Sequence, residues 1–145
     1  MPRSKKYECA ETIKQTLAQR MGSANDARAV AEATLGTWRQ MAVRLEPVIG
    51  ARGVDALFRR SLLLTSRTLP WLKLPENTRD NALLLDWLQM LLASLETKEA
   101  VASSCSLLAN FTELLASLIG DSLAKHLLKQ VWEPASPASE QETPS

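Results

Sequence analysis

The stretch KEAVASSCSLLANFTELLASLIG, residues 98–120, decides the fold class of this chain. Its apolar side chains recur at three- and four-residue steps, while serines, Asn110 and Glu113 occupy the opposite side. Gly120 follows, and glycine is favoured just past a helix end. The stretch therefore predicts an amphipathic helix from about Lys98 to Ile119. Its expected buried side chains are Val101, Leu107, Leu108, Phe111, Leu114, Leu115 and Leu118.

The same spacing recurs along the rest of the chain, without the alternation typical of β-strands. We expect five further helices, about Tyr7–Met21, Asn25 or Asp26 to Glu46, Gly53–Leu69, Thr78–Leu95 and Asp121–Trp132. They are separated by Gly22, by Pro47 and Gly50, and by Pro70. The helix that begins near Thr78 is apolar over more than half of its circumference, so we place it at the centre of the bundle.

Length and composition favour one domain. The chain has 145 residues, of which 46% are hydrophobic and 23% charged, close to the average globular mixture. We therefore predict an all-α fold, a single-domain bundle of five or six helices over residues 7–132. Residues 1–6 are expected to form a flexible basic N-terminus, and residues 133–145 a disordered acidic tail rich in Pro and Ser.

Neither a secretory signal nor a membrane span is expected. Met1 to Arg20 is charged and polar, without the apolar run of a signal peptide. The longest apolar-rich window, Ala82–Leu95, is broken by Asp86 and Gln89 and is shorter than the ~20 residues that a span needs. These patterns predict a cytoplasmic protein.

No pattern indicates catalysis, a metal or a cofactor. A Gly-x-Ser-x-Gly elbow and a glycine-rich phosphate loop are absent. The carboxylates Asp80, Asp86, Glu96, Glu99, Glu113 and Asp121 show no paired-acid or Glu-x-x-His spacing. Cys9 and Cys105 lie far apart in the sequence, and the chain has only one histidine. We therefore interpret both cysteines as apolar fillers rather than metal ligands. The sequence therefore predicts a protein that is not an enzyme and uses no cofactor.

His126 is the only histidine of the chain. The sequence HLLK at residues 126–129 resembles the phosphoacceptor motif of histidine-phosphotransfer domains in two residues, the histidine and the lysine three positions later. The resemblance implies an exposed imidazole that accepts a phosphoryl group. Gln130 stands where that family usually has glycine, which puts the close approach of a partner domain in doubt. The other interpretation is a solvated histidine near a helix C-terminus.

Arginines give the clearest surface signal. Four of them project within about 100° of one another from the helix expected over Gly53–Leu69, opposite its apolar side. We name this face the Arg ridge, made of Arg52, Arg59, Arg60 and Arg67. Such a ridge suits phosphates, an acidic protein surface or anionic lipid, or it pairs with acids on neighbouring helices such as Asp86 and Glu96.

Four tryptophans stand out beside one tyrosine and two phenylalanines. Trp38 and Trp87 fall within apolar stripes and are expected in the core. Trp71 follows Pro70 in an apolar loop, and Trp132 lies in the last helical turn. Each of these two is either a partly exposed anchor for a partner or ordinary packing at the edge of the core.

The net charge of +1 conceals a polarised chain. Residues 1–75 hold 13 Lys and Arg against 6 Asp and Glu, whereas residues 76–145 hold 4 against 10. The two halves therefore carry +7 and −6. They either neutralise each other within the bundle or leave a dipolar surface that orients a partner or favours self-association.

These observations favour a small non-enzymatic interaction or regulatory protein that docks a protein partner. The expected partner-binding residues are Arg52, Arg59, Arg60, Arg67, Trp71 and Trp132. One alternative is a nucleic-acid-associated regulator that uses the basic N-terminal half. A second is a histidine-phosphotransfer-like signalling module at His126. Self-association is also open, because Leu63 lies beside the Arg ridge and outside the predicted core.

Overall fold

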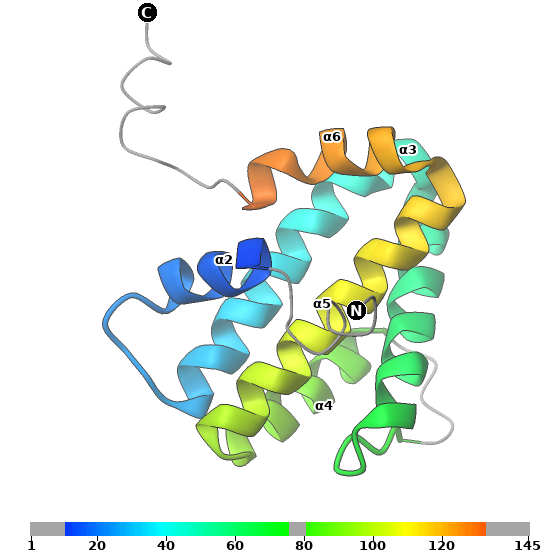
Figure 1. Ribbon diagram of the computed structural model, residues 1–145. Helices are drawn as coiled ribbons and strands as arrows, with labels where there is room; N and C mark the ends of the chain where they lie inside the picture. Colours follow the sequence, from blue (N-terminus) through cyan, green and yellow to red (C-terminus); the bar gives the residue numbers. More distant parts are fainter. Residues whose placement is uncertain (1–10, 76–80, 133–145) are drawn as a thin grey trace, which may run out of the picture.

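The computed structural model describes residues 11–75 and 81–132, and all of their regular structure is helical (Figure 1). The helices are α2 (Glu11–Met21), α3 (Ala27–Thr68), α4 (Asn81–Ser94), α5 (Thr97–Ile119) and α6 (Asp121–Trp132). For these residues the predicted all-α fold is confirmed. The predictions for residues 1–6, for a helix start at Tyr7 or Thr78 and for the tail 133–145 lie outside the described residues.

The longest helix, α3, reverses direction at Gly50. There φ is 82° and ψ is 158°, a conformation that only glycine adopts readily. In Figure 1 the chain rises to this point and then descends, so α3 consists of a first leg, residues 27–49, and a second leg, residues 51–68. The predicted break at Pro47 and Gly50 is confirmed at Gly50, whereas Pro47 lies inside the helix.

The signals at the helix ends act as predicted. Asp26 caps the first leg, because its Oδ1 accepts the N–H of Ala29 at 2.9 Å. Gly22 and Gly120 follow α2 and α5 with φ of 63° and 97°. At both positions glycine lets the chain leave the helix in the left-handed half of φ space. These helix boundaries are therefore set by single residues, a capping aspartate and two glycines.

Aromatic rings join the two legs of α3 to α5. The ring centroid of Trp38, on the first leg, lies 4.5 Å from that of Phe58 on the second leg. It lies 4.8 Å from that of Phe111 on α5, with the rings edge to face. Pairs in this range stabilise a core beyond their area burial. All three side chains are buried, which confirms Trp38 as a core residue.

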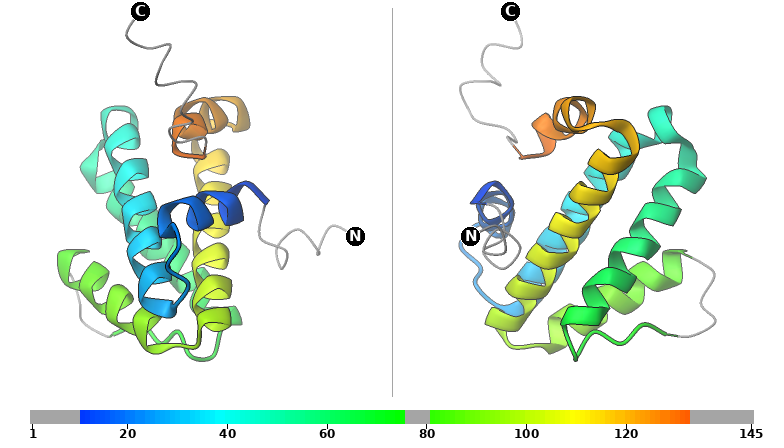
Figure 2. Two further views of the ribbon diagram at one scale, coloured as in Figure 1. Left: turned by 90° about the vertical axis from the view of Figure 1, so that its left-hand side faces the viewer. Right: turned by 45° about the vertical axis from the view of Figure 1, so that its right-hand side comes forward.

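The centre of the bundle is α5, not α4 as expected from hydrophobicity. Helix α5 packs against both legs of α3, and eight of its residues are buried. Helix α4 lies at one edge (Figure 2) and buries only the stripe Leu84, Leu88 and Leu92. Its Leu83 is 59% exposed and its Met90 73%. An apolar composition favours burial but does not decide how many neighbours a helix has.

Hydroxyl and amide groups seat α3 on α5. The hydroxyls of Thr34 and Ser104 lie 2.7 Å apart in the buried interface. On the second leg, Thr65 Oγ1 accepts a hydrogen bond from Asn110 Nδ2 at 2.9 Å. Ser103, expected on a polar outer face, is buried, and its hydroxyl donates to the Glu99 carbonyl. Small hydroxyl residues fit between close helices once a carbonyl of their own helix accepts their proton.

Helices α2 and α6 both cross the first leg of α3 (Figure 1). Ile13 and Leu17 of α2, and Leu128 and Val131 of α6, enter the common core. The Thr16 hydroxyl donates to the Trp132 carbonyl at 3.1 Å and so joins α2 to the end of α6. Leu118 and Leu123, expected in the core, are 59% and 40% exposed because they lie at the outer corner where α5 turns into α6.

One described helix, Thr97–Ile119, is long and apolar enough to cross a membrane by length and composition alone. From the sequence, the more apolar window Ala82–Leu95 is the candidate span, and it is too short. In the structure this helix is α5, whose packing at the centre of the bundle gives its apolar face a partner. A core helix of this length passes the same test as a span.

Candidate docking surfaces

The Arg ridge follows the outer face of the second leg of α3. Arg52, Arg60 and Arg67 are exposed and Arg59 is half-buried. The opposite face of the leg is buried and contains Val54, Phe58, Ser61, Leu62 and Thr65. Arginines spaced at seven, eight and fifteen residues return to one side of a helix, so the predicted direction of the ridge is confirmed.

Three ridge arginines lack an ion pair with any residue that the structure describes. In the described residues the ion pairs are Arg28–Glu32 at 3.8 Å and Lys125–Asp121 at 3.3 Å, and neither involves Arg52, Arg60 or Arg67. Pairing of those three with Asp86 or Glu96 is therefore not found. Arg59 is different, because it has a partner within the chain. The three other guanidinium groups keep their donors available to solvent or to a ligand.

An exposed leucine lies among these charges. Leu63 is 40% exposed on the same face of the leg, one turn after Arg59 and one turn before Arg67. The expectation that Leu63 lies outside the core is confirmed. An aliphatic side chain flanked by guanidinium groups is suited to an amphipathic partner, since it offers apolar area and charged donors together.

At its end the ridge borders a cleft between the second leg and α5. The cleft has a volume of about 330 Å³. Its lining residues are Leu64, Arg67, Thr68, Ser106, Ala109, Asn110 and Glu113. Arg67 is the only basic side chain among them and Glu113 the only acidic one. The cleft therefore extends the ridge with polar groups rather than adding positive charge.

The two candidate tryptophans lie apart from each other. Trp71, just past the second leg, is half-buried, and its Nε1 donates to Ser103 Oγ at 2.8 Å. Trp132 is half-buried at the end of α6, which crosses the first leg, and its carbonyl faces α2. Both rings pack against the core. The fold thus puts Trp71 at the ridge end of the second leg and places Trp132 elsewhere, and a partner role for either stays a prediction.

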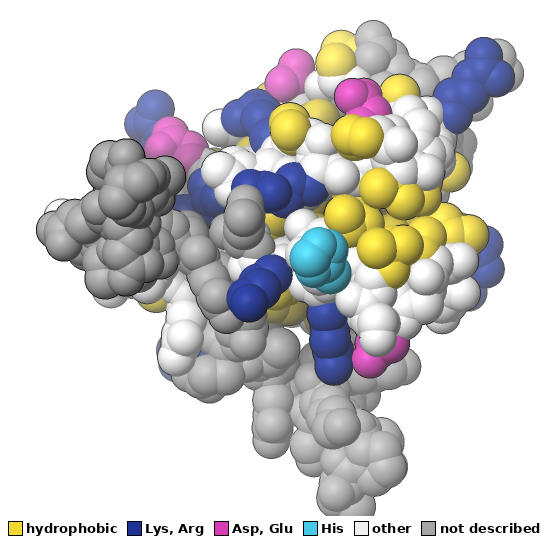
Figure 3. Space-filling model, turned by 90° about the horizontal axis from the view of Figure 1, so that it is seen from above, with side chains coloured by type: hydrophobic (Ala, Val, Ile, Leu, Met, Phe, Trp, Pro, Cys, Tyr) yellow, Lys and Arg dark blue, Asp and Glu magenta, His cyan; other side chains and the backbone are white. Residues whose placement is uncertain are grey.

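His126 is exposed on α6. Figure 3 shows the histidine on the surface, with Lys and Arg side chains around it and hydrophobic side chains to one side. An accessible imidazole is what phosphoryl transfer requires, but it is also the ordinary state of a surface histidine. The phosphotransfer interpretation of His126 therefore stays a prediction.

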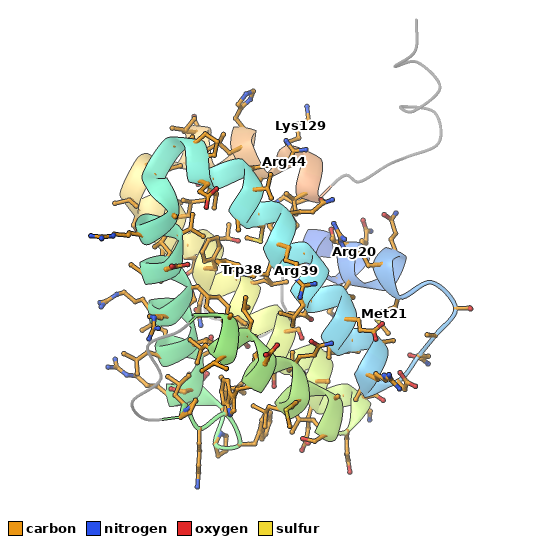
Figure 4. The ribbon with its side chains drawn as sticks, turned by 180° about the vertical axis from the view of Figure 1, so that it is seen from behind. Arg20, Met21, Trp38, Arg39, Arg44 and Lys129 are labelled. Carbon is orange, nitrogen blue, oxygen red and sulfur yellow. The ribbon has the colours of Figure 1, made fainter. Side chains whose placement is uncertain are left out.

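A second basic surface, absent from the sequence analysis, lies on the first leg. A hollow of about 490 Å³ is lined by Arg39, Gln40, Val43 and Arg44. We call it the basic hollow. Figure 4 shows Arg44 and Lys129 of α6 toward one end of this face, with Arg20 of α2 and Arg39 farther along. The four cations come from three helices, so no single-helix spacing could reveal them.

Arg20 packs against the first leg beside the hollow. Its Nη1 lies 3.3 Å from the position that a Cβ on Gly36 would occupy, so the missing side chain leaves room for the guanidinium. Its Nε is buried without a hydrogen-bond partner. Burial lowers the pKa of Arg20 from its ordinary value. A cation is therefore held here at some cost in desolvation.

Metal chemistry finds no support in the part of the chain that the structure describes, where no group of three or more His, Cys, Asp and Glu side chains could hold an ion. Cys105 is buried and its sulfur is in a disulfide, which corrects its interpretation as a simple apolar filler. Cys9 lies outside the described residues. Comparison of the chain with known protein families, with curated proteins and with solved structures finds no match.

Proposed function

We propose that this protein is a non-enzymatic docking module that binds an acidic protein segment along the Arg ridge. The observation that carries the proposal is the exposed row Arg52, Arg60 and Arg67, which has no ion pair with residues 11–75 or 81–132 and lies around the exposed Leu63. A guanidinium group can form two parallel hydrogen bonds with one carboxylate, which a lysine ammonium group cannot do. A row of arginines therefore favours a partner that carries carboxylates.

The spacing of the ridge suits a helical or extended segment that carries acids about two helical turns apart. Arg60 and Arg67 are seven residues apart, which corresponds to roughly 10 Å along the helix axis. Leu63 lies between them and can receive an apolar side chain of the partner. The rigid backbone of the second leg, packed on α5, holds these groups in place before binding.

The test is a fluorescence anisotropy titration at low salt with a labelled peptide of stated composition, a 15-residue segment with four glutamates and two leucines at helical spacing. We expect Arg60→Glu/Arg67→Glu to weaken binding at least about tenfold through lost attraction and new repulsion. Lys98→Glu, which changes a single exposed charge on α5, is the matched control and should leave the affinity close to that of the wild type.

Two results contradict the proposal. One is equal affinity of the wild type and the ridge variant for the peptide. The other is tighter binding to duplex DNA than to the peptide, with a steep dependence on salt and on the same arginines. That second result favours the nucleic-acid-associated regulator instead.

A further inference from the structure

We infer that the basic hollow is a second docking site, which binds an extended acidic protein segment. This site lies on the first leg of α3, whereas the Arg ridge of the proposed function lies on the second leg. The two sites share no residue. The inference rests on the hollow and on the cations that line it and lie on the same face.

The floor of the hollow is a strip of α3 between two arginines. At about 100° per residue, Gln40 and Val43 project between the directions of Arg39 and Arg44. Val43 is 72% exposed, so the strip presents an unpartnered aliphatic side chain. The Gln40 amide offers both a donor and an acceptor, which suits the backbone of a bound chain. The strip thus combines apolar contact, amide pairing and two flanking charges.

Positive charge continues beyond the strip on the neighbouring helices. Arg20 lies over Gly36, with its Nε buried and unpaired, and Lys129 lies toward the Arg44 end of the same face (Figure 4). The hydrogen bond between Thr16 and the Trp132 carbonyl fixes α2 against α6. The cations are therefore carried by packed helices rather than by a loop.

Few described acids oppose this charge. Glu32, on the same leg, is paired with Arg28, and Asp121 of α6 is paired with Lys125. Glu46 is exposed on the rim, one turn beyond Val43. A surface with this excess of cations attracts anionic segments and repels basic ones.

The separation of the arginines favours a chain over a compact anion. Arg39 and Arg44 are five residues apart, or roughly 7.5 Å along the axis, and lie on opposite sides of the strip. In an extended segment, side chains at i and i+2 share a side and lie about 7 Å apart. Because Arg39 and Arg44 also project about 140° apart around the helix, their side chains diverge, and a chain with several carboxylates spans them better than one compact anion does. The occupant is therefore an extended segment with acids at alternate residues.

The experiment is a ¹⁵N–¹H NMR titration of the full chain with a decapeptide of alternating glutamate and serine. We expect shifts confined to the amides of about Gly36 to Glu46, with smaller ones at Arg20 and Lys129. Arg39→Ala or Arg44→Ala should each weaken binding about two- to fivefold, the effect of one exposed ion pair. Arg28→Ala, an exposed arginine on the same leg outside the hollow, is the matched control and should bind as the wild type does.

Three results overturn the inference: an equal loss in Arg28→Ala, shifts at the Arg ridge without shifts in the hollow, or displacement of the peptide by equimolar pyrophosphate, which indicates a site for small anions. The Arg60→Glu/Arg67→Glu variant separates the two proposals. If this variant still binds the decapeptide at the hollow but not the 15-residue peptide, the two sites are independent. A failure of the 15-residue peptide to bind the ridge then leaves this inference intact, and a failure of the decapeptide to bind the hollow leaves the proposed function intact.

Discussion

The two legs of α3 are joined directly at Gly50, yet they differ in what covers them. The first leg is crossed by α2 and α6, rests on α5 and contains most of the buried residues of α3, and its exposed surface includes the basic hollow. The second leg packs on one side only and leaves a whole face of arginines open. The two legs thus carry different basic surfaces, an open hollow on the first leg and a linear row of arginines on the second.

The difference follows from the reversal at Gly50. Because the chain turns back there, both legs lie beside α5, and α2 and α6 cross the first leg (Figure 1). The packing of neighbouring helices, rather than the amphipathic pattern of α3, determines which basic side chains from other helices lie near each leg.

The largest effect is expected at the aromatic contact between the legs. Trp38→Ala removes the ring that touches both Phe58 and Phe111. We expect a loss of about 3–5 kcal/mol in the free energy of unfolding, as for other large-to-small changes in a core. Urea denaturation measures it, with Trp87→Ala on the half-buried face of α4 as the control. A loss no larger than that of the control contradicts a core centred on Trp38.

The reversal itself gives the next largest effect. Gly50→Ala places a Cβ where φ is 82° and ψ 158°. No heavy atom beyond the adjacent residues lies within 4 Å of that position, so the cost is backbone strain alone. We expect a loss of about 1–3 kcal/mol in the free energy of unfolding. Unchanged stability in thermal and urea unfolding indicates that the legs are joined in another conformation.

A smaller and unequal effect is expected at the polar contacts that seat each leg on α5. Thr34→Val leaves the buried Ser104 hydroxyl without its partner, at a cost of about 1–3 kcal/mol. Thr65→Val removes the acceptor of Asn110, which borders a cleft, so water can replace it and we expect less than about 1 kcal/mol. Urea unfolding of both variants measures the difference. The opposite order contradicts the statement that the first leg is the more enclosed one.

Much of the fold could be predicted because each helix carries its own signals. The 98–120 stretch, the Asp26 cap and the glycines at the helix ends are local features, and all appear in the structure. The position of α4 in the bundle could not be predicted. Its many leucines favour burial, but they do not determine which helices pack against it. Leu83 and Met90 show that the preference is only partly met.

The same reasoning explains which candidate residues were found. The Arg ridge lies on one helix, so residue spacing alone gives its direction. The basic hollow is lined by the first leg alone, but Arg20 and Lys129 on the same face come from α2 and α6, and no local pattern predicts where those helices cross α3. One signal was present in the sequence: Gly36 within a helix, where glycine is unfavourable, indicates that another group approaches closely, and that group is Arg20.

The most direct test of the account is the salt dependence of peptide binding to the open second leg. The acidic 15-residue peptide should bind the wild type and the Lys98→Glu control alike, weaken as salt rises, and lose at least about tenfold in affinity with Arg60→Glu/Arg67→Glu at low salt. If wild type and ridge variant give the same affinity at every salt concentration, the Arg ridge is a solvated face and the docking function assigned to it is wrong.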